Sequence, residues 1–230
     1  MIPQLTLSLF PGIGLLDRAF EEEGYCVVRG PDVLWGGDIR RFTPPPQVFG
    51  GVIGGPPCQI FSSLKALNPL AGEKHGNLIP EFERVVFEAQ PVWFLMENVP
   101  GAPEADVPGY KVHSLVLNNR WVGGEQERVR RFSLGTRDGR CLDVDVSLFE
   151  NPNWHPTVLA GHGPVGRGHG YDSNPSIPEM CRLQGLPETF LDDAPFTVSG
   201  KRRVIGNGVP LPLGRAVAQA VRRAFPDGQP

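Results

Sequence analysis

Cys58 is the side chain in this sequence best placed to act as a nucleophile. It follows Gly55-Pro56-Pro57, and the two prolines fix φ and stiffen the approach, which favours a thiol held in an exposed, directed position. A free cysteine is also among the most buried residue types, so an inert structural cysteine is the alternative. The reactive form is the thiolate, and the pKa of a free cysteine is about 8.5, so a nearby arginine or local dipoles should favour the anion at Cys58.

Two further segments of the chain carry polar side chains that could bind or react with a substrate. Glu97 ends an apolar run that begins at Val92, where it can donate a proton or bind a substrate nitrogen; a solvated glutamate at the end of a strand is the alternative. Gln126, Arg128 and Arg130 alternate along an expected strand, so their side chains share one face. Three donors on one face predict a binding role, although alternating arginines usually mark a solvated face.

A glycine turn stands near the start of the chain. Gly12 and Gly14 lie between an expected strand over 5–10 and an expected helix whose apolar residues recur at i, i+3 and i+7 from Ile13. Glycines allow a tight turn that brings a ligand against the amino terminus of the helix. An ordinary strand-to-helix turn explains the G-x-G spacing equally well.

Two aspartates follow this turn in the sequence. Asp32 and Asp38 are near enough to reach the same crevice, and a carboxylate after the second strand commonly accepts hydrogen bonds from ribose hydroxyls. Asp38 fits a solvated turn equally well.

Apolar runs alternate with helical patterns along the chain. Strands are expected over 51–54 and 92–96, a helix from about 78 to 89, and a last helix from about 212 to 224. Strands that alternate with helices predict an α/β fold, a parallel sheet with helices on both faces. The carboxyl ends of such strands share one edge, which would bring the thiol and the glutamate together.

The composition excludes several classes of protein. Among 230 residues, 40% are hydrophobic and no apolar run reaches the roughly 20 residues needed to cross a membrane, so one main globular domain is expected. The amino terminus lacks a secretory pattern, which favours a cytoplasmic location. Four dispersed cysteines without a C-x-x-C pair argue against a metal site and a disulfide framework.

The net charge of −3 does not favour a nucleic-acid partner by itself. The distribution matters more than the sum, because basic residues cluster over 128–140 and over 201–203. These local basic patches leave nucleic-acid binding open.

The order of the motifs resembles that of the DNA (cytosine-5) methyltransferase family. The matching segments are Phe10-x-Gly12-x-Gly14, Gly37-Asp38-Ile39, Pro56-Pro57-Cys58-Gln59 with Phe61-Ser62, Glu97-Asn98-Val99, Gln126-x-Arg128-x-Arg130, Arg182-Leu183-Gln184-Gly185-Leu186-Pro187 and Gly206-Asn207-Gly208-Val209. Seven matches in the family's order are not a plausible coincidence. The resemblance implies a Rossmann-like methyltransferase sheet that uses S-adenosylmethionine, with double-stranded DNA as the partner of a monomeric, compact, phage-type enzyme.

The resemblance also assigns roles to individual residues. Four are catalytic: Cys58 adds to carbon 6 of a flipped cytosine, Arg128 favours the thiolate, Glu97 binds N3 and the exocyclic amine, and Arg130 holds O2. The residues assigned to the cofactor are Phe10, Gly12, Gly14, Asp32, Asp38, Ile39, Pro57, Asn207 and Val209. Those assigned to DNA are Gln59, Ser62, Gln126, Arg167, His169 and Tyr171.

The chain departs from the family in two segments. It divides into a main catalytic part over 1–132, a reduced target-recognition region over 133–178 and a return to the catalytic domain over 179–230. The short recognition region leaves few side chains to read bases, so we expect a target of about two to four base pairs. A helix usual in the family is missing after Asp32, and Trp35 there would stack on adenine or fill the core.

Two other functions fit the same motifs. A tRNA cytosine methyltransferase of this family would use nearly identical catalytic residues, and nothing in the sequence excludes RNA. An inactive DNA-binding relative is the alternative from another class, and intact Cys58, Glu97, Arg128 and Arg130 argue against it.

Overall fold

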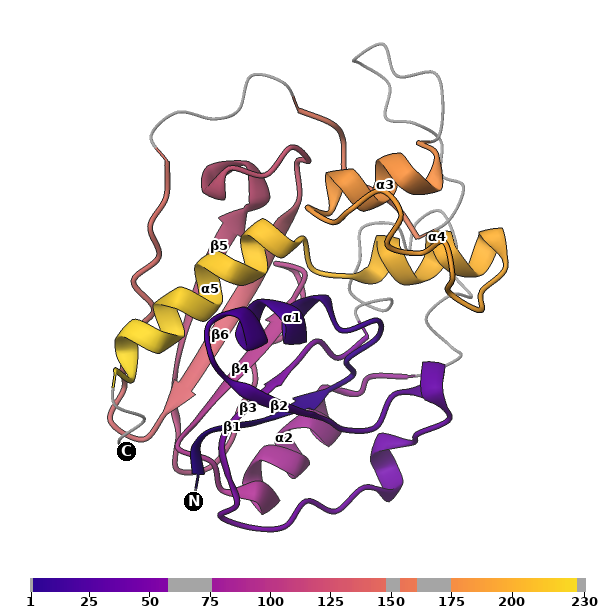
Figure 1. Ribbon diagram of the computed structural model, residues 1–230. Coiled ribbons are helices and arrows are strands. Elements are labelled where there is room, and N and C mark those ends of the chain that lie inside the picture. The colour runs from indigo at the N-terminus through magenta and orange to yellow at the C-terminus, as the bar shows by residue number, and fades with distance from the viewer. Residues whose placement is uncertain (1, 58–75, 148–153, 161–174, 227–230) are drawn as a thin grey trace.

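The computed structural model describes residues 2–57, 76–147, 154–160 and 175–226 (Figure 1). Its six strands are β1 (Ile2–Leu9), β2 (Cys26–Arg29), β3 (Phe49–Gly54), β4 (Trp93–Asn98), β5 (Lys111–Asn118) and β6 (Val129–Thr136). Its α-helices are α1 (Leu15–Glu22), α2 (Ile79–Ala89), α3 (Ile177–Leu183), α4 (Val198–Asn207) and α5 (Leu211–Ala224). The strands and helices expected from hydrophobic periodicity are present, with ends shifted by a few residues.

The sheet has the strand order β2-β1-β3-β4-β6-β5 and is only partly parallel. β2, β1, β3 and β4 run parallel, whereas β6 is antiparallel to β4 and β5 is antiparallel to β6. The expectation of a parallel sheet is therefore wrong for β6, whereas β5 runs in the same direction as the four parallel strands. The reason is that β5 and β6 follow each other without an intervening α-helix, so they pair as neighbours in a hairpin.

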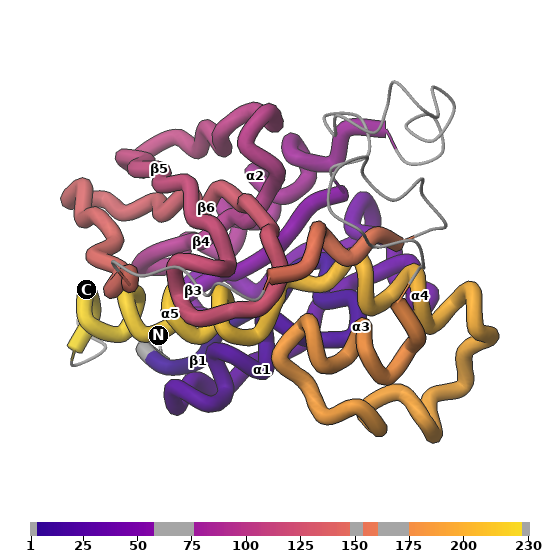
Figure 2. Tube along the Cα trace, turned by 90° about the horizontal axis from the view of Figure 1, so that it is seen from above, coloured from indigo at the N-terminus to yellow at the C-terminus, as the bar shows by residue number. Residues whose placement is uncertain are grey.

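Helices cover both faces of the sheet, as expected. Figure 2 shows α2 on one side and α1 with α5 on the other. Val52 and Phe94 face the core that includes Phe82 of α2, while their neighbours Ile53 and Leu95 face the core beneath α1 and α5. Alternate residues of β3 and β4 are thus buried on opposite faces, which explains why these strands are continuously apolar.

The carboxyl-terminal part of the chain returns to this sheet. α3 and α4 lie at the end of the molecule away from the two termini, and α5 runs back across the sheet to pack on α1 (Figures 1 and 2). The predicted boundary after residue 132 falls inside β6, so the sheet extends to Thr136. The division into catalytic and recognition parts stays a prediction.

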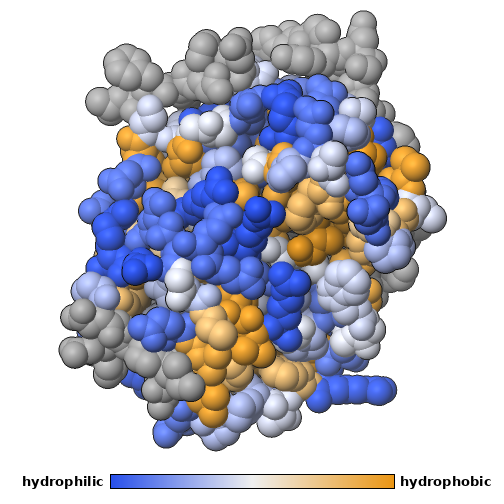
Figure 3. All heavy atoms as spheres, in the orientation of Figure 1, coloured by the Kyte–Doolittle hydropathy of each residue, from blue (hydrophilic) through white to orange (hydrophobic). Residues whose placement is uncertain are grey.

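Hydrophilic side chains dominate the middle of the face formed by α1 and α5, and hydrophobic residues occur there in separate patches (Figure 3). Glu22 of α1 pairs with Arg18 at 3.2 Å and with Arg215 of α5 at 2.5 Å. Among the helices that the structure describes, none combines the length and apolar character required to cross a bilayer.

Candidate active site

Glu97 and Arg130 form an ion pair where β4 ends. Nε of Arg130 lies 2.8 Å from Oε1 of Glu97, and the two side chains are 16% and 13% exposed. The sheet register creates the pair, because Glu97 lies opposite Phe132 of β6 and Arg130 precedes Phe132 by two residues on the same face. Two residues predicted to be catalytic are therefore adjacent and partly open to solvent.

The loop that leads to Cys58 begins beside this ion pair. A Cβ atom added at Gly55 would lie 2.9 Å from Oε2 of Glu97, so the loop backbone passes directly against the carboxylate. Nδ2 of Asn98 donates a 3.2 Å hydrogen bond to the carbonyl oxygen of Pro56. This bond fixes the start of the loop, while Cys58 itself lies outside the described residues.

Gln126 is fully buried. Its Nε2 donates to the carbonyl oxygen of Leu183 at 2.7 Å and to Oε1 of Gln184 at 2.9 Å, and its Oε1 accepts a 3.2 Å bond from the N–H of Val158. The side chain therefore bonds within the protein in this structure, and its predicted DNA contact stays a prediction. The side chain joins segments that lie far apart in the sequence.

Arg128 extends this polar network and is also buried. Its Nη1 donates to the carbonyl oxygen of Val158 at 3.0 Å and its Nη2 to that of Gly206 at 2.9 Å. Nε2 of Gln184 donates to the carbonyl oxygen of Gly208 at 3.3 Å. Gln126, Arg128 and Gln184 form what we call the buried junction, which connects the segment just before β6 to α3 and α4. An effect of Arg128 on the Cys58 thiolate stays a prediction.

The glycine turn connects β1 to α1. Phe10, Gly12 and Gly14 all have positive φ, at 56°, 57° and 78°, a region that glycine adopts freely and that strains Phe10. A Cβ atom added at Gly12 would meet nothing within 4 Å. Open space therefore lies beside the turn, next to the amino terminus of α1.

Asp32 connects the glycine turn to the segment after β2. Its Oδ2 accepts a 2.8 Å bond from the N–H of Gly12, and its Oδ1 accepts a 2.7 Å bond from the N–H of Leu34. Nε1 of Trp35 donates to the carbonyl oxygen of Gly12 at 2.8 Å. Trp35 is 57% exposed, so the alternative in which it fills the core is wrong. As the short spacing predicted, this segment forms a 3-10 turn, Val33–Trp35, in place of an α-helix.

Asp38 begins the next turn. The N–H of Gly37 donates to the carbonyl oxygen of Asp32 at 2.9 Å, which keeps the two aspartates close. Oδ1 of Asp38 accepts a 3.1 Å bond from the N–H of Arg40, and the Asp38 side chain is 42% exposed, so it is accessible to a ligand. Ile39 is buried in the core beside α2. The side chain anchors the turn in the core, and its predicted cofactor contact stays a prediction.

The segment after α4 lies against the start of α1. A Cβ atom added at Gly208 would lie 2.5 Å from Cδ1 of Leu15. Asn207 is exposed and Val209 is buried. Because Leu15 directly follows Gly14, these two predicted cofactor residues lie at the same end of α1 as the glycine turn.

Comparison with known proteins places the chain in a family. The family model described as C-5 cytosine-specific DNA methylase matches residues 35–158, more than half of the chain. The chain belongs to this family. The Type II methyltransferase M.HgiDI of Herpetosiphon aurantiacus is 31% identical to it, over 94% of each chain. The Type II methyltransferase M.NgoPII of Neisseria gonorrhoeae is 31% identical over 64% of this chain and 51% of its own length.

The solved structures similar to this chain share its fold. A mutant form of Spodoptera frugiperda DNMT2 has a TM-score of 0.65 at 13% identity, over 96% of this chain and 99% of its own. The chain spans about half the length of M.NgoPII and of M.FnuDI from Fusobacterium nucleatum, at 51% and 49%. The alignment with M.HgiDI is 292 residues long against 230 in this chain, so M.HgiDI carries residues that have no counterpart here.

Residues 154–160 of the predicted recognition region pack on the segment just before β6. The N–H of His155 donates to the carbonyl oxygen of Glu125, and the N–H of Glu127 donates to that of His155, both at 2.8 Å. Val158 is buried beside the buried junction. The segment over 154–160 is therefore anchored at the site.

Several predicted residues lie outside the described ranges. Their contacts with DNA stay predictions: Gln59, Ser62, Arg167, His169 and Tyr171. Pro57, half-buried, is the last described residue before Cys58. Within the described ranges, no group of three or more His, Cys, Asp or Glu side chains is placed to hold a metal ion.

Asp17 is a buried charge that the motifs did not predict. Ser8 Oγ donates to its Oδ1 at 2.5 Å and Arg29 Nε to its Oδ2 at 3.0 Å. Burial raises the pKa of this carboxyl, and the hydrogen bonds from Ser8 and Arg29 oppose the rise. The sequence carries a signal for it, because Asp17 shares the apolar face of α1 with Ile13 and Phe20 at i, i+4 and i+7. The contacts fix the first turn of α1 behind the glycine turn.

Proposed function

We propose that this chain is a DNA (cytosine-5)-methyltransferase that transfers a methyl group from S-adenosylmethionine to carbon 5 of a cytosine turned out of double-stranded DNA. The observation that carries the proposal is the Glu97–Arg130 ion pair, 2.8 Å apart, against the loop that leads to Cys58. Membership of the methylase family supports the same activity. A monomeric state and a cytoplasmic location stay predictions.

The carboxylate and the guanidinium of the ion pair complement the Watson–Crick edge of cytosine. The exocyclic amine of cytosine donates hydrogen bonds and its O2 accepts them. The carboxylate of Glu97 accepts from the amine, and the guanidinium of Arg130 donates to O2. Thymine has a carbonyl oxygen where cytosine has the amine, so it would leave Glu97 facing another acceptor. Glu97 therefore selects cytosine.

The same residues account for the chemistry. Carbon 5 of cytosine is a weak nucleophile until the Cys58 thiolate forms a bond to carbon 6, which moves electron density to carbon 5. Glu97 shares a proton with N3, which neutralises the negative charge that develops on the ring as sulfur adds, and it accepts a hydrogen bond from the amine. Once carbon 5 has accepted the methyl group, a base removes its proton and the carbon 6–sulfur bond breaks, which restores the thiolate.

The glycine turn has features that fit S-adenosylmethionine. Gly12 leaves open space beside the turn, and the accessible carboxylate of Asp38 can accept hydrogen bonds from an amine or a hydroxyl. Each Asp32 oxygen has a second acceptor site beyond its backbone bond. The residues proposed to hold the cofactor are Phe10, Gly12, Gly14, Asp32, Asp38, Pro57, Asn207 and Val209. When bound, the cofactor supplies the methyl group from its sulfonium.

Covalent trapping on duplex DNA that contains 5-fluorocytosine tests this proposal. Fluorine at carbon 5 cannot leave as a proton, so the adduct accumulates. With S-adenosylmethionine the wild type should form a complex with DNA that survives denaturing gel electrophoresis, and Cys58→Ala should form none. Cys141→Ala removes an exposed free cysteine and should form the adduct like the wild type.

The substrate class is tested in the same experiment. A folded wild type that neither forms the adduct nor methylates duplex DNA would overturn the proposed function. Methyl transfer to tRNA but not to duplex DNA would assign the activity to RNA instead. Sequencing of methylated DNA would then show the length of the target.

A further inference from the structure

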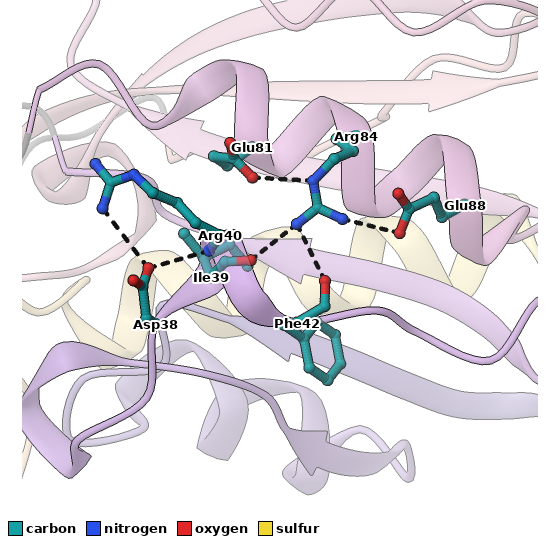
Figure 4. Close-up of polar contacts among 7 residues, drawn as sticks. All are labelled: Asp38, Ile39, Arg40, Phe42, Glu81, Arg84 and Glu88. Carbon is teal, nitrogen blue, oxygen red and sulfur yellow. Dashed lines mark hydrogen bonds and ion pairs between the residues drawn. The ribbon is translucent and has the colours of Figure 1, made fainter.

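Arg84 of α2 makes contacts that no role described above accounts for. Its Nη2 donates to two backbone carbonyl oxygens, that of Ile39 at 2.8 Å and that of Phe42 at 3.0 Å (Figure 4). Its Nε donates to Glu81 at 2.9 Å and its Nη1 to Glu88 at 2.8 Å. The guanidinium is therefore fixed on both sides, by carboxylates of its own helix and by the carbonyl groups of the turn.

The turn that Arg84 holds is the one that presents Asp38. It is a 3-10 turn over Ile39–Arg41, and the Oδ1 of Asp38 accepts from the N–H of Arg40 at its start. Figure 4 shows Asp38 on the side of the turn away from the Arg84 guanidinium. Arg84 thus contacts the back of the turn without occupying the space around the carboxylate.

A continuous series of hydrogen bonds extends from this turn to the glycine turn. The N–H of Gly37 bonds to the carbonyl oxygen of Asp32, and the carboxylate of Asp32 bonds to the N–H of Gly12. Three proposed cofactor residues are therefore connected through short hydrogen bonds, and Arg84 attaches one end of this series to α2.

We propose that Arg84 is a positioning residue for the cofactor site: it clamps the carbonyl groups of Ile39 and Phe42 and so holds Asp38 oriented toward the adenosyl part of the cofactor. This inference rests on the proposed function. A single planar guanidinium suits the task, because its fixed fork bonds two carbonyl groups at once, which an ammonium group does less well.

The fold of this region does not depend on Arg84 alone. α2 buries an apolar face made of Ile79, Phe82, Val85, Val86 and Ala89. Ile39 packs into the same core, so the turn stays next to α2 through apolar contacts. Loss of the guanidinium should therefore loosen the turn without unfolding the domain.

Binding of S-adenosylhomocysteine, measured by calorimetry, tests the proposal. Arg84→Met keeps the apolar stem and removes the donors, and we expect its Kd to rise about tenfold. The KM for S-adenosylmethionine should rise by a similar factor. The kcat at saturating cofactor and the KM for DNA should stay within about twofold, because Arg84 lies on the cofactor side.

Two further variants separate the clamp from the ion pairs. Arg84→Lys retains a charge for Glu81 and Glu88 but cannot make the forked contact, so it should also weaken binding. The double variant Glu81→Gln with Glu88→Gln removes the ion pairs and leaves both carbonyl bonds, so it should bind like the wild type. If this double variant loses as much affinity as Arg84→Met, the clamp is overturned.

Hydrogen exchange without ligand provides a readout independent of activity. The N–H groups of Arg41 and Phe42 bond within the turn, to the carbonyl oxygens of Asp38 and Ile39, and should exchange faster in Arg84→Met. If Arg84→Met shows unchanged exchange and unchanged affinity, the proposed role of Arg84 is overturned while the proposed function still stands. A folded wild type that binds no S-adenosylhomocysteine would overturn the proposed function, and the cofactor role of Arg84 with it.

Discussion

The Glu97–Arg130 pair and the buried junction use side chains from the same short segment in different ways. Arg130 contacts a carboxylate, and both members of that pair keep some exposed surface. Arg128 and Gln126, two and four residues earlier, are buried and bond to the backbone of segments far along the chain. One motif therefore provides both the proposed reacting surface and the structure that supports it.

The difference follows from what covers each part of the segment. Arg130 lies in β6 at the end of β4, where the sheet edge is open. Gln126 precedes β6 and is covered by α3 and by the segment over 154–160. A buried polar group must have hydrogen-bond partners, so the residues under this cover form hydrogen bonds that hold the fold together. Those at the open edge are free to meet a substrate.

The largest expected effect comes from Glu97→Gln. The amide retains a hydrogen bond to Arg130 but presents a weaker acceptor and no charge to the cytosine. We expect kcat to fall by about 10²–10³, the size seen when one group that stabilises developing charge is lost. Steady-state methyl transfer to duplex DNA measures this fall.

The stability of Glu97→Gln should change by less than about 1 kcal/mol, because the pair is close to solvent. Glu22→Gln makes the same chemical change in an ion pair on α1 and should leave kcat unchanged. A Glu97→Gln variant with near-normal kcat would remove Glu97 from the chemistry and contradict the contrast drawn between the two regions.

An intermediate effect, on stability, is expected from Gln126→Leu. The change leaves the carbonyl oxygen of Leu183 and the N–H of Val158 buried without their partner, at a cost of about 1–3 kcal/mol. Urea unfolding measures this loss, and kcat of the folded variant should stay within about threefold. Gln219→Leu removes a hydrogen bond to Glu23 on the surface and should cost less than about 0.5 kcal/mol.

Either of two results would contradict this assignment of Gln126. One is unchanged stability in Gln126→Leu. The other is a selective rise in the KM for DNA, which would mean that the side chain reaches the substrate in spite of its burial.

The smallest effect concerns Asp17, whose pairing with Arg29 has the same chemistry as the Glu97–Arg130 pair but a carboxylate only 1% exposed. Burial raises the pKa of Asp17 above 3.8, so its charged form is disfavoured in the folded state. The stabilisation linked to this group is complete below 3.8 and is lost as pH rises through the folded pKa.

Unfolding of the wild type and of Asp17→Asn at pH 7.5, 5.5 and 4.5 measures this linkage. As pH falls, the free energy of unfolding of the wild type should increase relative to that of Asp17→Asn. The increase is at most about 1.4 kcal/mol per pH unit, the slope for one proton. A difference that does not change with pH would show that the pKa of Asp17 is the same in the folded and unfolded states.

The sequence by itself determined the local elements and the family. Hydrophobic periodicity is a property of short segments, so β1, β3, β4, α2 and α5 were predictable near their observed bounds. The order of the motifs is likewise linear information, and the family match confirms it. The meeting of Glu97 with the loop before Cys58 was predictable too, because parallel strands end at a common edge.

Only the tertiary structure decided which motif residues are exposed. Alternation predicts that Gln126 and Arg130 share one face, yet Gln126 lies before β6, its contact with Leu183 spans 57 positions and the contact of Arg128 with Gly206 spans 78. The burial of Ile39 and the contact between Arg84 and its turn also join distant segments. Burial depends on what packs across a residue from elsewhere in the chain, and a pattern of spacings within one segment carries no information about that cover.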